Sequence, residues 1–135
     1  SHLNEANKAI ISLTLSSREE RTTILMVDDN EGMLELFWRY LGEDYNLVRA
    51  NNGQEGLYLA RKVSPELIIL DVMMPERDGW QLLQQLQSED KTQHIPVVVC
   101  SVLEDPELAY SLGATAFLPK PINRSQLFVT LHKIL

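Results

Sequence analysis

Residues 67–75 read Leu-Ile-Ile-Leu-Asp-Val-Met-Met-Pro, an unbroken apolar run that meets one carboxylate, Asp71. A continuous Leu/Ile run of this length is typical of a strand buried on both faces, as in a parallel sheet. A carboxylate at the carboxyl end of such a strand occupies the position where open α/β sheets bind ligands. Taken alone, Asp71 fits equally well an acid that simply begins a loop. The surrounding sequence has to decide between these interpretations.

Two kinds of apolar segment alternate along the chain from Thr22 onward. Short apolar runs predict five strands, and segments with apolar residues at helical spacing predict five helices. The predicted strands span residues 24–27, 45–50, 67–70, 97–100 and 116–118, and the predicted helices span residues 31–41, 54–63, 80–87, 106–112 and 125–135. This alternation indicates an α/β domain with a doubly wound parallel sheet and helices on both faces.

The composition is that of an ordinary globular chain of one domain. Its 135 residues carry a net charge of −7, which argues against direct binding of nucleic acid or anionic membranes. One cysteine excludes an internal disulfide framework and fits a reducing cytoplasm. No apolar run approaches the roughly 20 residues that cross a bilayer, and we find neither a signal peptide nor a glycine-rich phosphate-binding motif. We therefore expect a cytoplasmic protein without membrane insertion.

Residues 1–21 differ in composition from the rest of the chain. They are rich in Ser, Thr, Asn and charged residues, which favours an N-terminal tail or linker. Ile11, Leu13 and Leu15 alternate with polar residues, and this weak strand pattern leaves open a docking segment or the end of a preceding domain. The folded domain is predicted to span residues 22–135.

Polar side chains follow four of the five predicted strands. Because the carboxyl ends of parallel strands lie at one edge of a sheet, residues distant in sequence converge there. The side chains brought together in this way are Asp28 and Asp29 after the first strand, Asp71 after the third, Ser101 after the fourth and Lys120 after the fifth. Three acids, a hydroxyl and a lysine together indicate a functional site rather than unrelated loop caps.

The chemistry of this acidic cluster points to a divalent cation. Carboxylates packed together repel one another and raise one another's pKa values unless a cation lies between them. Mg2+ prefers a few carboxylates together with water and phosphate oxygens. A nearby lysine and hydroxyl suit in-line phosphoryl transfer with a carboxylate as nucleophile. No Ser-His-Asp or Cys-His arrangement competes, since His2, His94 and His132 fall in the tail, a loop and the last helix.

The order and spacing of several short motifs resemble the response-regulator receiver domain over residues 22–135. These motifs are Asp28-Asp29, Asp71 with Met74-Pro75, Asp78-Gly79 (where we also expect a turn), Ser101 and Lys120-Pro121. The resemblance implies a flavodoxin-like fold with strand order 2-1-3-4-5 and a phosphorylation-dependent signalling switch of a two-component phosphorelay. It further implies a histidine kinase or phosphotransfer protein as partner, together with an output domain or protein.

The resemblance also assigns roles to individual residues. Asp71 is expected to be the phosphoacceptor, with Lys120 paired to the phosphoryl group and Ser101 hydrogen-bonded to it. The Lys120–Pro121 peptide bond is expected to be cis. Ser101 and the aromatic Phe117 are expected to move together as the two-state switch, although Phe117 also fits a strand residue that only packs on the fourth helix.

The same resemblance implies Mg2+ as the cofactor. Asp29, Asp71 and the backbone carbonyl of Met73 are expected to bind the ion directly, and Asp28 through a water molecule.

Three features depart from the usual family pattern. Val102 stands where a smaller residue is commoner, which predicts narrower access to the site. Met73 and Leu103, two positions beyond the acceptor and the hydroxyl, are apolar and cannot orient an attacking water, which predicts slow self-dephosphorylation. Ser101 and Lys120 are only 19 positions apart, which predicts a short fourth helix and puts the usual dimer and partner face in doubt.

Two classes of function remain open from the sequence. One is the signalling switch, which catalyses only its own phosphorylation and dephosphorylation. The alternative is a Mg2+-dependent small-molecule phosphotransferase or phosphatase with an Asp nucleophile. That class usually has a second Asp two residues after the nucleophile, where this chain has Met73. The acids and the lysine argue against a passive interaction module. A homodimer, and an origin within a larger protein such as a hybrid kinase, stay open.

Overall fold

The computed structural model describes residues 21–74, 78–102 and 105–135, and within them five strands alternate with five helices. In chain order these are β1 (Thr23–Val27), α2 (Glu31–Leu41), β2 (Asn46–Ala50), α3 (Gly53–Val63), β3 (Leu67–Asp71), α4 (Asp78–Ser88), β4 (Val97–Ser101), α5 (Pro106–Ser111), β5 (Ala116–Pro119) and α6 (Arg124–Ile134). Each boundary agrees with the predicted one to within two residues. Over these residues, no helix has the length and apolar character that would let it span a bilayer.

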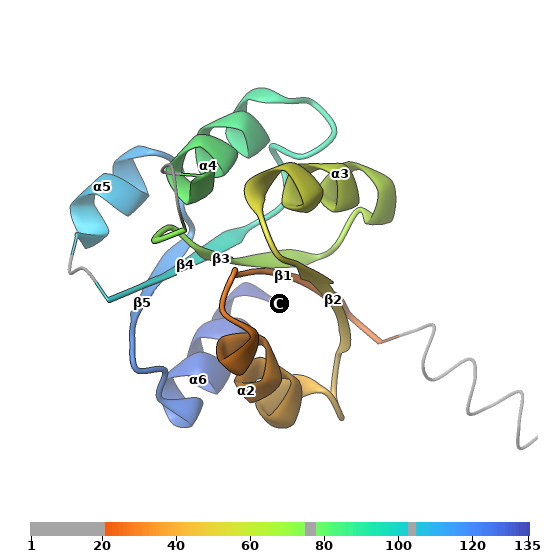
Figure 1. Cartoon of the computed structure of the whole chain (residues 1–135), viewed down its shortest axis with the longest axis vertical. Helices are drawn as coiled ribbons and strands as arrows, with labels where there is room; N and C mark the ends of the chain where they lie inside the picture. The colour runs from red at the N-terminus through yellow and green to blue at the C-terminus, as the bar shows by residue number, and fades with distance from the viewer. Residues whose placement is uncertain (1–20, 75–77, 103–104) are drawn as a thin grey trace, which may run out of the picture.

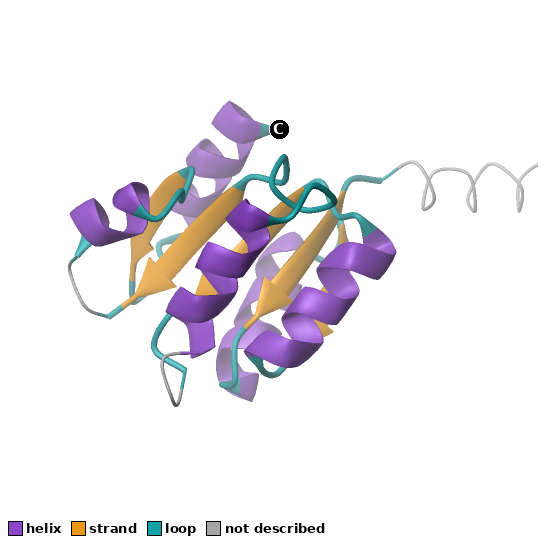
Figure 2. Ribbon diagram, turned by 90° about the horizontal axis from the view of Figure 1, so that it is seen from above, coloured by secondary structure: helices purple, strands orange, loops and turns teal. Residues whose placement is uncertain are grey.

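All five strands pair in parallel, in the predicted order β2-β1-β3-β4-β5. The central strand β3 is buried along its whole length, as its unbroken apolar run predicts. Because the strands are parallel, their carboxyl ends lie at the same edge of the sheet (Figure 2). The strand order reverses between β1 and β3, and the carboxyl ends at such a reversal border the crevice where open α/β sheets bind ligands.

Helices cover both faces of the sheet, α3, α4 and α5 on one face and α2 and α6 on the other (Figure 1). Alternate residues of one strand pack into the two layers, since successive side chains of a strand point to opposite faces. Ile68 and Leu70 of β3 belong to the core beneath α3 and α4, whereas Leu67 and Ile69 belong to the core beneath α2 and α6. The strand that carries Asp71 is therefore fixed from both sides.

Side-chain caps fix the start of four helices. Asn30, Asn52, Asp105 and Asn123 each accept a hydrogen bond from a backbone N–H in the first turn of α2, α3, α5 and α6. The cap at Asn30 matters most for the site. Asn30 lies only two residues after Asp28, and α2 begins at the next residue, so the loop at the carboxyl end of β1 is short.

The helix between β4 and β5 is short, which confirms the prediction from the spacing of Ser101 and Lys120. α5 contains only the six residues Pro106–Ser111. The chain then turns at Gly113, whose φ of 102° lies in a region that residues with a side chain rarely adopt.

The predicted turn at Asp78-Gly79 is wrong, because both residues belong to α4. A β carbon on Gly79 would lie 2.5 Å from the carbonyl oxygen of Asp71 and closer still to the Cα of Val72. The glycine therefore allows the start of α4 to contact the backbone at the end of β3. In a sequence, a glycine required for close approach looks the same as a glycine in a turn.

We predict that Gly79→Ala destabilises the fold by about 1–3 kcal/mol, the usual cost of forcing a methyl group into a packed contact. The backbone at Asp71 and Val72 has to move to admit the β carbon. Gly32→Ala is the matched control, because a β carbon there meets only the side-chain oxygen of Asn30, at 3.1 Å. This control should change the free energy of unfolding by less than about 1 kcal/mol. Urea denaturation of both variants is the measurement, and equal free energies of unfolding would contradict the prediction.

Candidate functional site

The side chains predicted from the strand ends lie together at the carboxyl edge of the sheet. Asp28 and Asp29 follow β1, Asp71 is the last residue of β3, Ser101 is the last residue of β4 and Lys120 follows β5. β1, β3, β4 and β5 are consecutive neighbours in the sheet. The strand order therefore brings together residues from separate parts of the chain.

The three acids form one cluster. Asp28, Asp29 and Asp71 each offer a carboxylate oxygen, and these oxygens lie within 4.8 Å of one another. Asp28 and Asp71 are buried, at 2% and 4% exposure, whereas Asp29 is exposed to solvent. The cluster is thus open on the side of Asp29 and closed on the side of the sheet.

Each buried carboxylate is held by the backbone of its own loop. The N–H of Asn30 donates to Oδ1 of Asp28, and the N–H of Met73 donates to Oδ1 of Asp71, each at 2.9 Å. In both loops the donor is two residues beyond the acid. These bonds orient the two carboxylates and leave the Oδ2 atom of each for another partner.

Lys120 is that partner for both acids. Its Nζ lies 3.2 Å from Oδ2 of Asp28 and 3.3 Å from Oδ2 of Asp71. The side chain of Lys120 is 12% exposed, so most of the charge interaction takes place away from solvent. The backbone N–H of Lys120 donates to the carbonyl of Ser101 at 2.9 Å, and the peptide bond to Pro121 is cis, the form that the resemblance implies.

The acid–base properties of the site follow from this geometry. Burial raises the pKa of Asp28 to about 6, and the charge of Asp71 adds to the rise, while the hydrogen bond from Asn30 and the charge of Lys120 oppose it. Burial lowers the pKa of Lys120, but the charges of Asp28 and Asp71 outweigh it, so the net pKa is raised and the ammonium group stays charged. The site therefore holds more negative charge than one lysine neutralises.

Ser101 and Phe117, the predicted switch residues, occupy neighbouring strands. Ser101 is 1% exposed and ends β4. Phe117 is half-buried on β5, in register with Val99 of β4, and packs against the core on the side of α3 and α4. Ser101 thus lies at the carboxyl edge of the sheet, and Phe117 connects the neighbouring strand β5 to the core.

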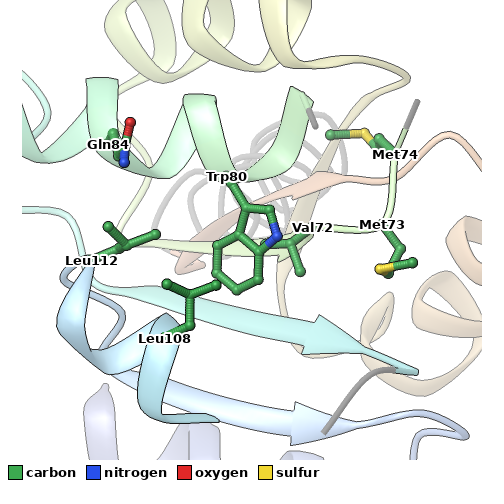
Figure 3. A pocket seen from close by; sticks show the side chains of 7 residues that line it. All are labelled: Val72, Met73, Met74, Trp80, Gln84, Leu108 and Leu112. Carbon is green, nitrogen blue, oxygen red and sulfur yellow. The ribbon is translucent and has the colours of Figure 1, made fainter. Parts of the chain in front are cut away.

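A cavity of about 580 Å³ lies beside the site (Figure 3). Its lining is mainly apolar and comes from the loop after β3, from α4 and from α5: Val72, Met73, Met74, Trp80, Gln84, Leu108 and Leu112. Sequence reasoning did not find this cavity. The only signal in the sequence was the short spacing that predicts a short fourth helix, because the cavity lies between that helix and α4.

Two exposed apolar residues flank the acidic cluster. Met73 lies two residues after β3 and Val102 directly after β4, and they are 44% and 62% exposed. The predicted motif residue Pro75, the predicted apolar Leu103 and the tail of residues 1–20 lie outside the described residues.

Known proteins resemble this chain over nearly all of its folded part. The family described as the response regulator receiver domain matches residues 24–132. The polar-differentiation response regulator DivK of Brucella anthropi is 32% identical over 117 residues, which cover 84% of this chain and 95% of DivK. A histidine kinase of Formosa agariphila is 35% identical over 126 residues, which cover 90% of this chain and 9% of the kinase. The chain thus spans about the whole of one relative and a small part of the other.

The fold is also that of a solved chemotaxis protein, CheY4 of Vibrio cholerae. The two share 28% identity with a TM-score of 0.79, over 85% of this chain and 99% of CheY4. The match to the family, the strand order and the cluster of acids with a lysine at the carboxyl edge all agree. This chain therefore belongs to the response regulator receiver domain family, whose members are phosphorylation-dependent switches of two-component signalling.

Proposed function

We propose that this chain accepts a phosphoryl group on Asp71 from the phosphohistidine of a histidine kinase or phosphotransfer protein. The observation that carries the proposal is the position of Asp71 at the end of the central strand, 3.3 Å from Lys120 and clustered with Asp28 and Asp29. A carboxylate oxygen of Asp71 forms a bond to phosphorus while the phosphorus–nitrogen bond of the donor breaks, and the electron pair stays on the donor imidazole. Lys120 then stabilises the phosphoryl charge as its pairing partner.

The donor set fits Mg2+, because three carboxylates within 4.8 Å of one another are the hard oxygen ligands that this ion prefers. We infer that Asp29, Asp71 and the backbone carbonyl of Met73 hold the ion, and that Asp28 contacts it through a water molecule. When bound, the ion supplies positive charge to the phosphoryl oxygens. The exposure of Asp29 supports this arrangement, since it gives the ion and the donor a route from solvent.

The signal leaves the site through Ser101 and Phe117. Ser101 offers a hydroxyl to the phosphoryl group from the end of β4. Phe117 follows on β5, where its half-buried ring packs against the core on the side of α3 and α4. We infer that the two side chains move together and change the protein-binding surface of the domain, which an output domain or protein reads. A homodimer through the same surface stays a prediction.

We infer that the chain catalyses only its own phosphorylation and dephosphorylation. An Asp-based phosphatase usually has a second Asp two residues beyond its nucleophile as acid and base, and this chain has the thioether of Met73 at that position. The same residue cannot orient an attacking water, so we infer a long-lived aspartyl phosphate.

Asp71→Asn tests the phosphoacceptor directly. Incubation of the wild type with Mg2+ and acetyl phosphate should add the mass of one phosphoryl group, and beryllofluoride with Mg2+ should change the tryptophan fluorescence, to which Trp38 and Trp80 both contribute. Both responses should be absent from Asp71→Asn, because an amide is neither a nucleophile at phosphorus nor an anionic oxygen ligand for beryllium. Asp90→Asn is the matched control, since Asp90 is an exposed acid in the loop after α4. A wild type whose response equals that of Asp71→Asn would overturn the proposal.

Met73→Asn tests the slow reset. An amide at this position can hydrogen-bond to the attacking water, so the variant should lose its phosphoryl group severalfold faster than the wild type. The measurement is the decay of phosphorylated protein by intact mass after acetyl phosphate has been removed. The interpretation fails if the two proteins decay at the same rate.

The raised pKa of Asp28 predicts a specific pH dependence of stability without metal. The pKa is about 6 in the folded chain against 3.8 for an unperturbed Asp. Between these values the folded state holds a proton that the unfolded state has released, so stability falls as the pH rises through this window. Urea denaturation in EDTA should show this loss in the wild type relative to Asp28→Asn. The prediction is contradicted if the difference in free energy of unfolding between the two proteins stays the same across this pH range.

A further inference from the structure

Met73 differs from the other three methionines of the chain in its exposure. Met26 and Met74 are buried, at 0% and 4% exposure, and Met33 is half-buried on α2. Met73 is 44% exposed. An oxidant in solvent therefore reaches the thioether of Met73 more readily than the other three.

The position of Met73 ties its side chain to the phosphorylation site. Its backbone N–H donates to Oδ1 of Asp71 at 2.9 Å, so the side chain begins at the loop that orients this carboxylate. Figure 3 shows the side chains of Met73 and Met74 pointing in different directions from the loop. The side chain of Met73 lines the cavity together with Trp80 and Leu108. A change of polarity at Met73 thus occurs in the loop whose backbone holds the carboxylate of Asp71.

A peroxide converts an exposed thioether into a sulfoxide. A sulfur–oxygen bond forms, the oxygen–oxygen bond of the peroxide breaks, the sulfur is oxidised by two electrons and the remaining oxygen leaves as water. The product is a polar group whose oxygen accepts hydrogen bonds, in place of a group that accepts them only weakly.

The cysteine does not compete for this oxidant. Cys100 is 1% exposed, and burial raises the pKa of its thiol to about 12, so the reactive thiolate is absent at neutral pH.

We propose that Met73 is a peroxide-sensitive modification site, and that its sulfoxide shortens the life of the phosphoryl group on Asp71. This inference rests on the proposed role of Asp71 as phosphoacceptor. The thioether offers the attacking water no strong hydrogen-bond acceptor, whereas the sulfoxide oxygen offers one at the same place. Peroxide therefore turns a slowly resetting switch into a faster one, and a methionine sulfoxide reductase with a thiol reductant restores the slow form.

The test begins with the site of oxidation. The full chain is treated with hydrogen peroxide, and peptide mass mapping follows the oxidation of each methionine with time. Met73 should be oxidised severalfold faster than Met26, Met33 and Met74. Equal or slower oxidation of Met73 overturns the inference, whether or not the chain accepts phosphate.

The second part measures the life of the phosphoryl group. Treated and untreated protein are phosphorylated with acetyl phosphate and Mg2+, the donor is removed, and the decay is followed by intact mass. The treated protein should decay severalfold faster and should recover after sulfoxide reductase and dithiothreitol. Oxidised Met73 with an unchanged decay rate overturns the inference. Untreated protein that takes up no phosphate overturns the proposed function instead.

Three variants test whether the response to peroxide comes from Met73. Met73→Leu should lose the dependence of its decay rate on peroxide, and Met33→Leu, the matched control, should keep it. Met73→Gln imitates the polarity of the sulfoxide and should decay fast with or without peroxide. A peroxide response that persists in Met73→Leu overturns the inference.

Discussion

The contact of Lys120 with two buried carboxylates is the interaction on which the site depends. Asp28 and Asp71 come from the ends of β1 and β3, and Lys120 reaches both from the end of β5, at 3.2 and 3.3 Å. Burial of two like charges without a cation is costly, and removal of one partner from such a group leaves an uncompensated charge. Lys120 thus contacts Asp28, which lies 92 positions earlier in the sequence, and allows the acids to lie beneath the surface.

The same arrangement explains why the site suits the reversible binding of charged groups. One lysine does not neutralise three acids, so the metal-free site keeps excess negative charge. Burial is the main cause of the raised pKa of Asp28, and the charge of Asp71 adds to it. A divalent cation would relieve this repulsion, and the phosphoryl group proposed for Asp71 would then bring new negative charge next to Lys120. The energy of the site therefore changes strongly with what it binds. That sensitivity is the physical requirement for a switch.

The region between α4 and the six-residue helix α5 contains the features that separate this receiver domain from the usual family pattern. A short α5 accompanies the mainly apolar cavity, and Met73 on its wall is at once exposed and hydrogen-bonded through its backbone to Asp71. The backbone of Met73 orients the carboxylate of Asp71, the proposed phosphoacceptor, whereas its side chain is proposed to set the chemistry available to an attacking water. The rate at which the switch resets is in this view a property of one exposed side chain.

The sequence alone determined the fold class, the short α5 and the strand order that the resemblance implies. It also determined which residues lie at the strand ends, because strand burial and parallel pairing leave few alternatives for where these ends lie. Only the tertiary structure decided how the side chains meet. It showed that Lys120 bridges Asp28 and Asp71, that Gly79 permits a close contact rather than a turn, and that a cavity adjoins Met73. Distances, exposure and cavities depend on packing between segments far apart in the chain, which local patterns do not encode.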